Sequence, residues 1–105
     1  MVKTKAMKDY LITILTRQDV LIKDQVWKAE SMHDAEKKVS IFLFDKEFKD
    51  SSDKNNRLHK KEEFIGKSNL WMHLISQSGE TPGEVFFVKI EEEESGMRGA
   101  MAGAF

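Results

Sequence analysis

The chain has 105 residues, of which 40% are hydrophobic and 33% are charged, and its formal net charge at pH 7 is −1. This composition excludes a wholly disordered chain, and the near-neutral charge gives no general attraction to nucleic acid or to a membrane. The chain contains no cysteine, which excludes disulfides and thiolate chemistry and favours an intracellular, cytoplasmic protein. A chain of this length is expected to form one small domain.

The first structured part is predicted to be a β-hairpin over residues 9–30, preceded by a flexible segment, 1–8. The run DYLITILTR is rich in β-branched residues and apolar on both faces, which predicts a strand over 9–17. The second strand, VLIKDQVWKAE, is interrupted by charged and amide residues, which indicates one solvent-facing side. We expect Trp27 and Ala29 to lie beneath the element that follows.

The clearest helix is predicted over residues 31–48, SMHDAEKKVSIFLFDKEF. Ser31 is a typical N-cap, and Asp34 places negative charge in the first turn, where the helix dipole favours it. Four residues form one stripe at helical spacing: Ala35, Val39, Phe42 and Lys46. We therefore expect Val39 and Phe42 to face the sheet. Further apolar residues widen the stripe and leave a side for a loop or a partner, namely Ile41, Leu43, Phe44 and Phe48.

Residues 50–63 are predicted to form a long polar loop, because Leu58 is their only apolar residue. Loops of this length are usually functional or disordered. The stretch 68–76 fits either a strand or a short helix, and the closely placed Gly66 and Gly79 favour the strand. The last strand, EVFFVKI, is apolar on both faces, which indicates an interior position in the sheet.

The expected fold is therefore α+β, a single domain over residues 9–91 with β-β-α-β-β-β order. Short connections favour an antiparallel sheet of about four to five strands with one main helix packed across one face. We expect the last strand to end near Ile90, because the four glutamates that follow cannot lie in an apolar sheet interior without partners. Residues 92–105 are predicted to be a flexible tail, first acidic and then rich in glycine, alanine and methionine.

The sequence offers little for catalysis. Its histidines are His33, His59 and His73, and no two of them have the short spacing of a metal site built on one element. There is no Gly-x-Ser-x-Gly elbow and no glycine-rich phosphate loop. We therefore predict no catalytic residue, no metal, no cofactor and no enzymatic activity. The longest apolar run, IFLF, is far shorter than the about 20 residues of a membrane span, so no membrane partner is expected.

A basic segment offers one possible binding site. Four positive charges fall within eight residues: Lys54, Arg57, Lys60 and Lys61. Such a loop can contact phosphates, with Trp71 or Phe64 as stacking partners for bases. The alternative interpretation is a solvated loop, because acidic residues flank and neutralise it: Asp50, Asp53, Glu62 and Glu63.

The predicted tail offers another possible binding site. Met97, Met101 and Phe105 recur every four residues in a glycine-rich setting, as in a docking peptide that becomes ordered in a groove. A frayed terminus is the alternative. Together with Phe44 and Phe48 these residues form the predicted protein-binding set.

The sequence thus predicts a non-enzymatic regulator or assembly factor that binds another protein or a second copy of itself. Small accessory proteins of phages and mobile elements often have this character, which is an analogy of class only. A nucleic-acid-binding accessory protein that uses residues 54–61 is the second hypothesis.

Overall fold

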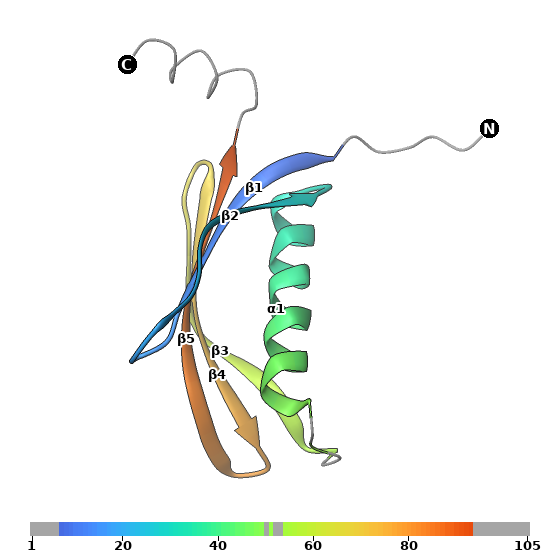
Figure 1. Ribbon diagram of the computed structural model, residues 1–105, viewed down its shortest axis with the longest axis vertical. Helices are drawn as coiled ribbons and strands as arrows, with labels where there is room; N and C mark the ends of the chain where they lie inside the picture. Colours follow the sequence, from blue (N-terminus) through green and yellow to red (C-terminus); the bar gives the residue numbers. More distant parts are fainter. Residues whose placement is uncertain (1–6, 50, 52–53, 94–105) are drawn as a thin grey trace, which may run out of the picture.

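A computed structural model describes residues 7–49, 51 and 54–93 of the chain. Its elements are β1 (Lys8–Leu15), β2 (Val20–Ala29), α1 (Met32–Phe48), β3 (Asn56–Ile65), β4 (Asn69–Ser78) and β5 (Thr81–Glu93). The strands form one antiparallel sheet in the order β2-β1-β5-β4-β3. Figure 1 shows α1 lying along one side of the curved sheet. The predicted α+β fold is confirmed.

Three predictions about the strands are also confirmed. β1 and β2 form the predicted hairpin. The segment that fitted either a strand or a helix is the strand β4. The last strand, β5, lies in the middle of the sheet between β1 and β4, as its two apolar faces indicated. The apolar residues on one face of β5 thus belong to the core, and those on the other face lie on the side of the sheet that α1 does not cover.

The predicted polar loop over 50–63 is wrong for most of its length, because β3 begins at Asn56 and pairs with β4 as far as Ile65. β3 is an edge strand whose side chains are mostly solvent-exposed, so it needs few apolar residues. Only Leu58 and residues near its end are apolar, and Leu58 packs against the core. Charged residues are common on edge strands because they discourage pairing with other chains.

The expected end of the last strand near Ile90 is also wrong, since β5 continues to Glu93. The three added glutamates stay paired with β1, where Glu92 lies opposite Tyr10. They lie at the end of the sheet, where carboxylates reach solvent and basic groups rather than an apolar interior. The Glu92 carboxylate, for example, is 3.3 Å from the ammonium of Lys8. Glu92 and Glu93, the first two residues of the predicted tail, therefore belong to the sheet.

The sheet-facing stripe of α1 shares Ala35 and Val39 with the predicted stripe, so the expectation for Val39 is confirmed, but it continues through Leu43 instead of Phe42. Ala35, Val39 and Leu43, each four residues from the next, are fully buried. Phe42 is 38% exposed, so the expectation that it faces the sheet is wrong. Its ring instead packs edge-on against Trp27 of β2, with centroids 5.6 Å apart. Phe42 therefore closes the side of the core rather than filling its centre.

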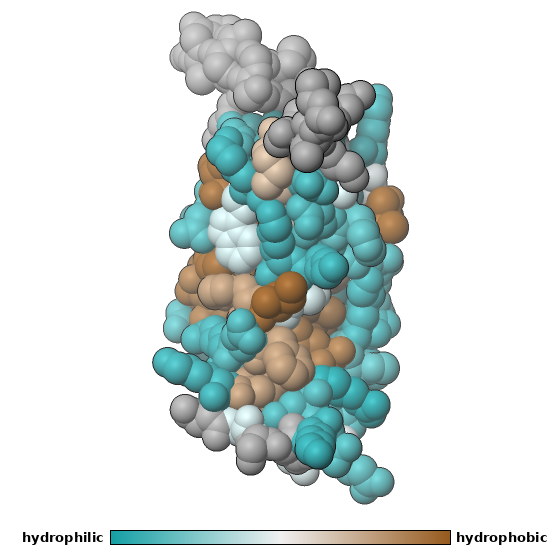
Figure 2. All heavy atoms as spheres, turned by 90° about the vertical axis from the view of Figure 1, so that its right-hand side faces the viewer, coloured by the Kyte–Doolittle hydropathy of each residue, from teal (hydrophilic) through white to brown (hydrophobic). Residues whose placement is uncertain are grey.

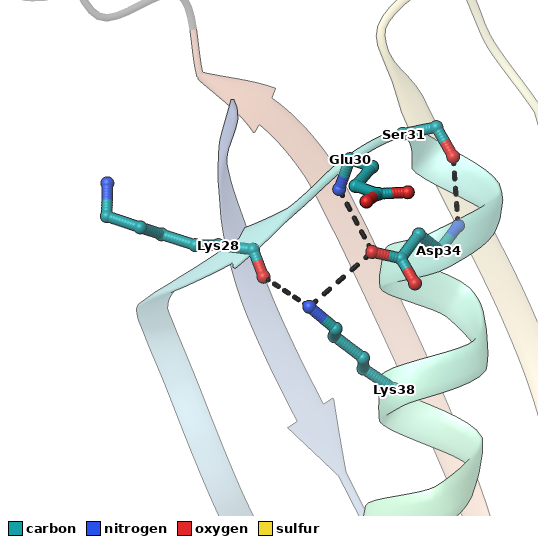
Figure 3. A network of polar contacts seen from close by, with 5 residues as sticks. All are labelled: Lys28, Glu30, Ser31, Asp34 and Lys38. Atoms are coloured by element: carbon teal, nitrogen blue, oxygen red, sulfur yellow. Dashed lines mark hydrogen bonds and ion pairs between the residues drawn. The ribbon is translucent and has the colours of Figure 1, made fainter. Parts of the chain in front are cut away.

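Figure 3 shows how the start of α1 is fixed to the end of β2. Ser31 is the predicted N-cap, and its hydroxyl accepts a hydrogen bond from the Asp34 amide at 3.1 Å. The Asp34 carboxylate in turn accepts the amide N–H of Glu30 at 2.9 Å. Lys38 donates to the Lys28 carbonyl and lies 3.4 Å from Asp34. The hydrogen bond from Glu30, helped by the charge of Lys38, lowers the pKa of Asp34.

The far end of α1 is held by a buried serine on β4. The Ser76 hydroxyl accepts the amide N–H of Glu84 at 2.8 Å and donates to the Glu47 carboxylate at 3.0 Å. Ser76 is buried, so these partners satisfy a hydroxyl that water does not reach. The helix is therefore attached to the sheet by polar contacts at both ends and by apolar contacts between them.

Candidate functional site

An aromatic cluster lies on the sheet face opposite α1, which we call the bare face. In β4 the side chains of Leu70, Met72 and Leu74 are buried on the face that α1 covers. Strand alternation therefore places Trp71 and His73 on the bare face. The cluster consists of Phe64, Trp71, His73 and Phe87. Three of its rings are strongly exposed, with Phe64 at 65%, Trp71 at 51% and Phe87 at 42%.

Pairing between strands brings the cluster together. Phe64 of β3 lies opposite Trp71 of β4. His73 lies opposite Phe87 of β5, and their rings stack with centroids 4.9 Å apart and planes 22° apart. The ammonium of Lys89 is 5.7 Å from the centre of the Trp71 ring, close enough for a cation–π contact. The cluster lines an open, mostly apolar depression of about 470 Å³.

Apolar surface continues from the cluster towards β2. Phe87 lies opposite Leu15 of β1, and Leu15 lies opposite Val20 of β2. Val26, further along β2, lies opposite Leu11 on the same face. Leu15, Val20 and Val26 are all exposed. The bare face is therefore apolar across the width of the sheet, which is more than the isolated apolar residues found on any protein surface.

The charges of the bare face are mixed. Strand alternation places these acidic residues on it: Asp9, Asp24, Glu62, Glu91 and Glu93. It places these basic residues there: Lys28, Arg57 and Lys89. One pair is already formed, since the Lys28 ammonium is 2.7 Å from the Asp9 carboxylate. Because the acids outnumber the bases, this face does not attract a phosphate backbone in particular.

The two sheet edges are poorly suited to adding another strand. In β2 the backbone at Asp24 has a φ of 47°, and the register with β1 shifts nearby. The Asp24 amide donates to the Thr13 hydroxyl at 3.0 Å, which holds this irregularity in place. In β3 the register shifts between Lys60 and Glu62, in the most charged part of the strand. Bulges and charges of this kind protect sheet edges from strand addition.

A second apolar surface lies on the helix side, along the flank between α1 and β3. It has two hollows. The upper hollow, of about 350 Å³, is lined by Met32, His33, Glu36, Lys60, Glu63, Ile65 and Leu70. The lower hollow, of about 430 Å³, is lined by Lys37, Ser40, Ile41, Phe44, Asp45 and Leu58. Figure 2 shows apolar side chains gathered over the lower half of this side of the molecule.

The predicted protein-binding residues fall partly on this flank. Phe44 lines the lower hollow, and its ring centroid is 4.9 Å from that of Phe48 in the last turn of α1. Both rings therefore extend the apolar flank towards the end of the helix. Met97, Met101 and Phe105 lie outside the described residues.

The four basic residues of the nucleic-acid hypothesis do not form one surface. Lys54 precedes β3, and Lys61 lies at the register shift. Alternation places Arg57 on the bare face and Lys60 on the helix side.

Lys60 is moreover occupied by two carboxylates. Its ammonium donates to Glu63 at 2.5 Å and to Glu36 at 2.9 Å. These bonds, that to Glu63 first, raise the pKa of Lys60. Its charge is therefore already balanced within the molecule.

The structure does bring together the two predicted stacking residues, Phe64 and Trp71. Sequence reasoning missed Phe87, His73 and Lys89 as their neighbours. One signal for them was present in the sequence. A central strand that is apolar on both faces, in a domain with a single helix, must leave one of its faces without a helix over it.

Among the residues that the structure describes, no group of three potential metal ligands lies close together. No helix in the described part of the chain is long and apolar enough to cross a membrane. The chain matches no known family, and no curated protein or solved structure is significantly similar to it.

Proposed function

We propose that this chain is a small non-enzymatic binding protein, a regulator or assembly factor that acts by protein–protein interaction, and that it associates with a second copy through the bare face. The observation that carries the proposal is the exposed aromatic cluster around Trp71. Large aromatic residues dominate the binding energy of protein interfaces, where a few well-packed anchors are surrounded by polar groups. An intracellular location stays a prediction based on the lack of cysteine.

A second copy is a suitable occupant for two reasons. In a two-fold dimer a surface meets itself, so it must be complementary to itself. The bare face carries an apolar centre together with charges of both signs, among them Lys89 and Glu91. Association through the sheet edges is disfavoured by their bulges and charges, which leaves face-to-face packing, as in β-sandwiches.

The direct test is sedimentation equilibrium over a range of concentrations for the wild type and for the double variant Phe64→Ala, Trp71→Ala. We expect a reversible dimer whose dissociation constant rises at least about thirtyfold in the double variant, since interface anchors contribute 2 kcal/mol or more. Ile41→Ala is the matched control, because Ile41 is also an exposed apolar residue but lies on the helix side. A wild type that stays monomeric, or a dimer that the double variant leaves unchanged, contradicts the proposal.

The nucleic-acid hypothesis keeps one supporting observation, the pairing of Phe64 with Trp71 on the face that also carries Arg57. Aromatic residues on a sheet next to basic groups can stack on the bases of single strands. Elution from a heparin column separates the two hypotheses. Retention that falls steeply with salt, by a chain that is monomeric in sedimentation, favours nucleic acid. Absence of retention at low salt contradicts this second function.

A further inference from the structure

We propose that the chain's own residues 95–105 dock on the flank between α1 and β3, with Met97 in the upper hollow and Met101 in the lower hollow. This inference is independent of the bare face. It assigns an occupant to the apolar surface that contains Phe44 and Phe48, the described members of the predicted protein-binding set.

The flank lies within reach of the chain that follows β5. The end of β5 and the start of α1 are at the same end of the molecule (Figure 1). Leu70, which lines the upper hollow, lies opposite Ile90 of β5, three residues before the strand ends. Four further residues span at most about 13 Å in an extended conformation, and this length sets how far Met97 can reach from the end of β5 towards the upper hollow.

The spacing of the two hollows matches the spacing of the two methionines. Met32 lines the upper hollow and Ser40, eight residues further along α1, lines the lower one. Eight helical residues correspond to about 12 Å. Met97 and Met101 are separated by about 13 Å in an extended chain and point to the same side of it. The glycines of this segment disfavour a helix, in which the same two residues would be only about 6 Å apart.

The chemistry of the hollows also fits. The lower hollow is lined mainly by apolar groups, among them Ile41 and Leu58, and flexible methionine side chains adapt to such surfaces. In the upper hollow the carboxylates of Glu36 and Glu63 share the single ammonium of Lys60. The remaining negative charge suits Arg98, the residue next to Met97.

Methyl-labelled methionine in the full chain provides the test, read by NMR in the Trp71→Ala background so that association through the bare face does not interfere. We expect nuclear Overhauser contacts from the Met97 methyl to Ile65 and from the Met101 methyl to Leu58. These contacts should not depend on protein concentration. Random-coil methyl signals without such contacts would overturn the proposal, and contacts that vanish on dilution would overturn docking within one chain.

Trypsin cleavage after Arg98 gives a second readout in the same full chain. Replacing Ile41, which is 53% exposed, by serine should speed this cleavage about tenfold, because an apolar contact of the docked segment is lost. Val26→Ser is the control, since Val26 is 50% exposed and lies on the bare face. Equal cleavage rates in the wild type and in both variants would contradict the docking.

Discussion

The two faces of the sheet are built from the same strands but differ in what covers them. On the helix side, Ile12, Val88 and Leu74 are buried beneath α1. On the bare face, Trp71 and Phe87 come from the neighbouring positions of the same strands and remain exposed. Strand alternation supplies apolar side chains to both faces of a central strand, and one helix covers only one of them. The comparison separates residues that stabilise the fold from residues available for association.

The largest effect on stability is expected from Leu43→Ala, because Leu43 is fully buried between α1 and the sheet. Its free energy of unfolding should fall by about 2–5 kcal/mol, a large share of the stability of a small domain. Phe42→Ala is the matched comparison. Since Phe42 is partly exposed at the side of the core, we expect a smaller loss. If urea denaturation shows a larger loss of stability for Phe42→Ala than for Leu43→Ala, the helix orientation predicted from the sequence would be the right one.

A smaller loss is expected from Ser76→Ala, which tests the polar attachment between the end of α1 and the sheet. The change leaves the Glu84 amide without the hydroxyl that accepts its hydrogen bond. An unsatisfied buried polar group costs about 1–3 kcal/mol. Ser76→Thr keeps the hydroxyl and serves as the control in the same denaturation experiment. An alanine variant as stable as the wild type would show that water replaces the serine.

Ser31→Ala should cost about 1 kcal/mol, because it removes the N-cap of α1. Asp is also a good N-cap, so Ser31→Asp should retain most of the stability. Thermal melting of the three proteins checks this prediction. Equal melting temperatures for serine and alanine would mean that the carboxylate of Asp34 alone fixes the start of the helix.

The smallest effect concerns alkaline pH. The pKa of Lys60 is raised above its ordinary value of 10.5, so its contribution to stability is complete below that pH and is lost as the pH rises through the folded-state pKa. Burial, together with the charge of Glu92, also raises the pKa of Tyr10 from 10.0, and its contribution is lost in the same direction. Urea midpoints measured between about pH 9 and about pH 11.5 should fall less steeply in Lys60→Met than in the wild type. An identical fall of the urea midpoint with pH in both proteins would show that Lys60 does not contribute to this pH dependence.

Much of the fold follows from local patterns in the sequence. The alternation in β1 and β5 predicts strands, and Ser31 with Asp34 predicts the start of α1. The position of β5 in the sheet follows from its two apolar faces. These features depend on residues that are close together in the chain, so periodicity and capping rules are sufficient to find them.

Other features depend on neighbours that are distant in the sequence. β3 resembles a loop because an edge strand can be almost entirely charged, and its pairing with β4 decides its conformation. Leu43 rather than Phe42 lies on the sheet-facing side of α1, because Trp27 of β2 offers the phenylalanine ring a partner at the side of the core. The aromatic cluster combines residues from three strands, and only their register brings Phe87 beside His73.

The two tryptophans of the chain allow the central claim to be measured on both faces at once. Trp71 belongs to the bare face, and Trp27 packs against the core on the helix side. In a chain labelled with 5-fluorotryptophan, each gives its own ¹⁹F resonance, which can be followed while the protein is diluted. Association of second copies through the bare face predicts that the Trp71 resonance shifts with concentration while that of Trp27 does not. Two resonances that both stay constant over the whole range, or a shift confined to Trp27, would contradict it.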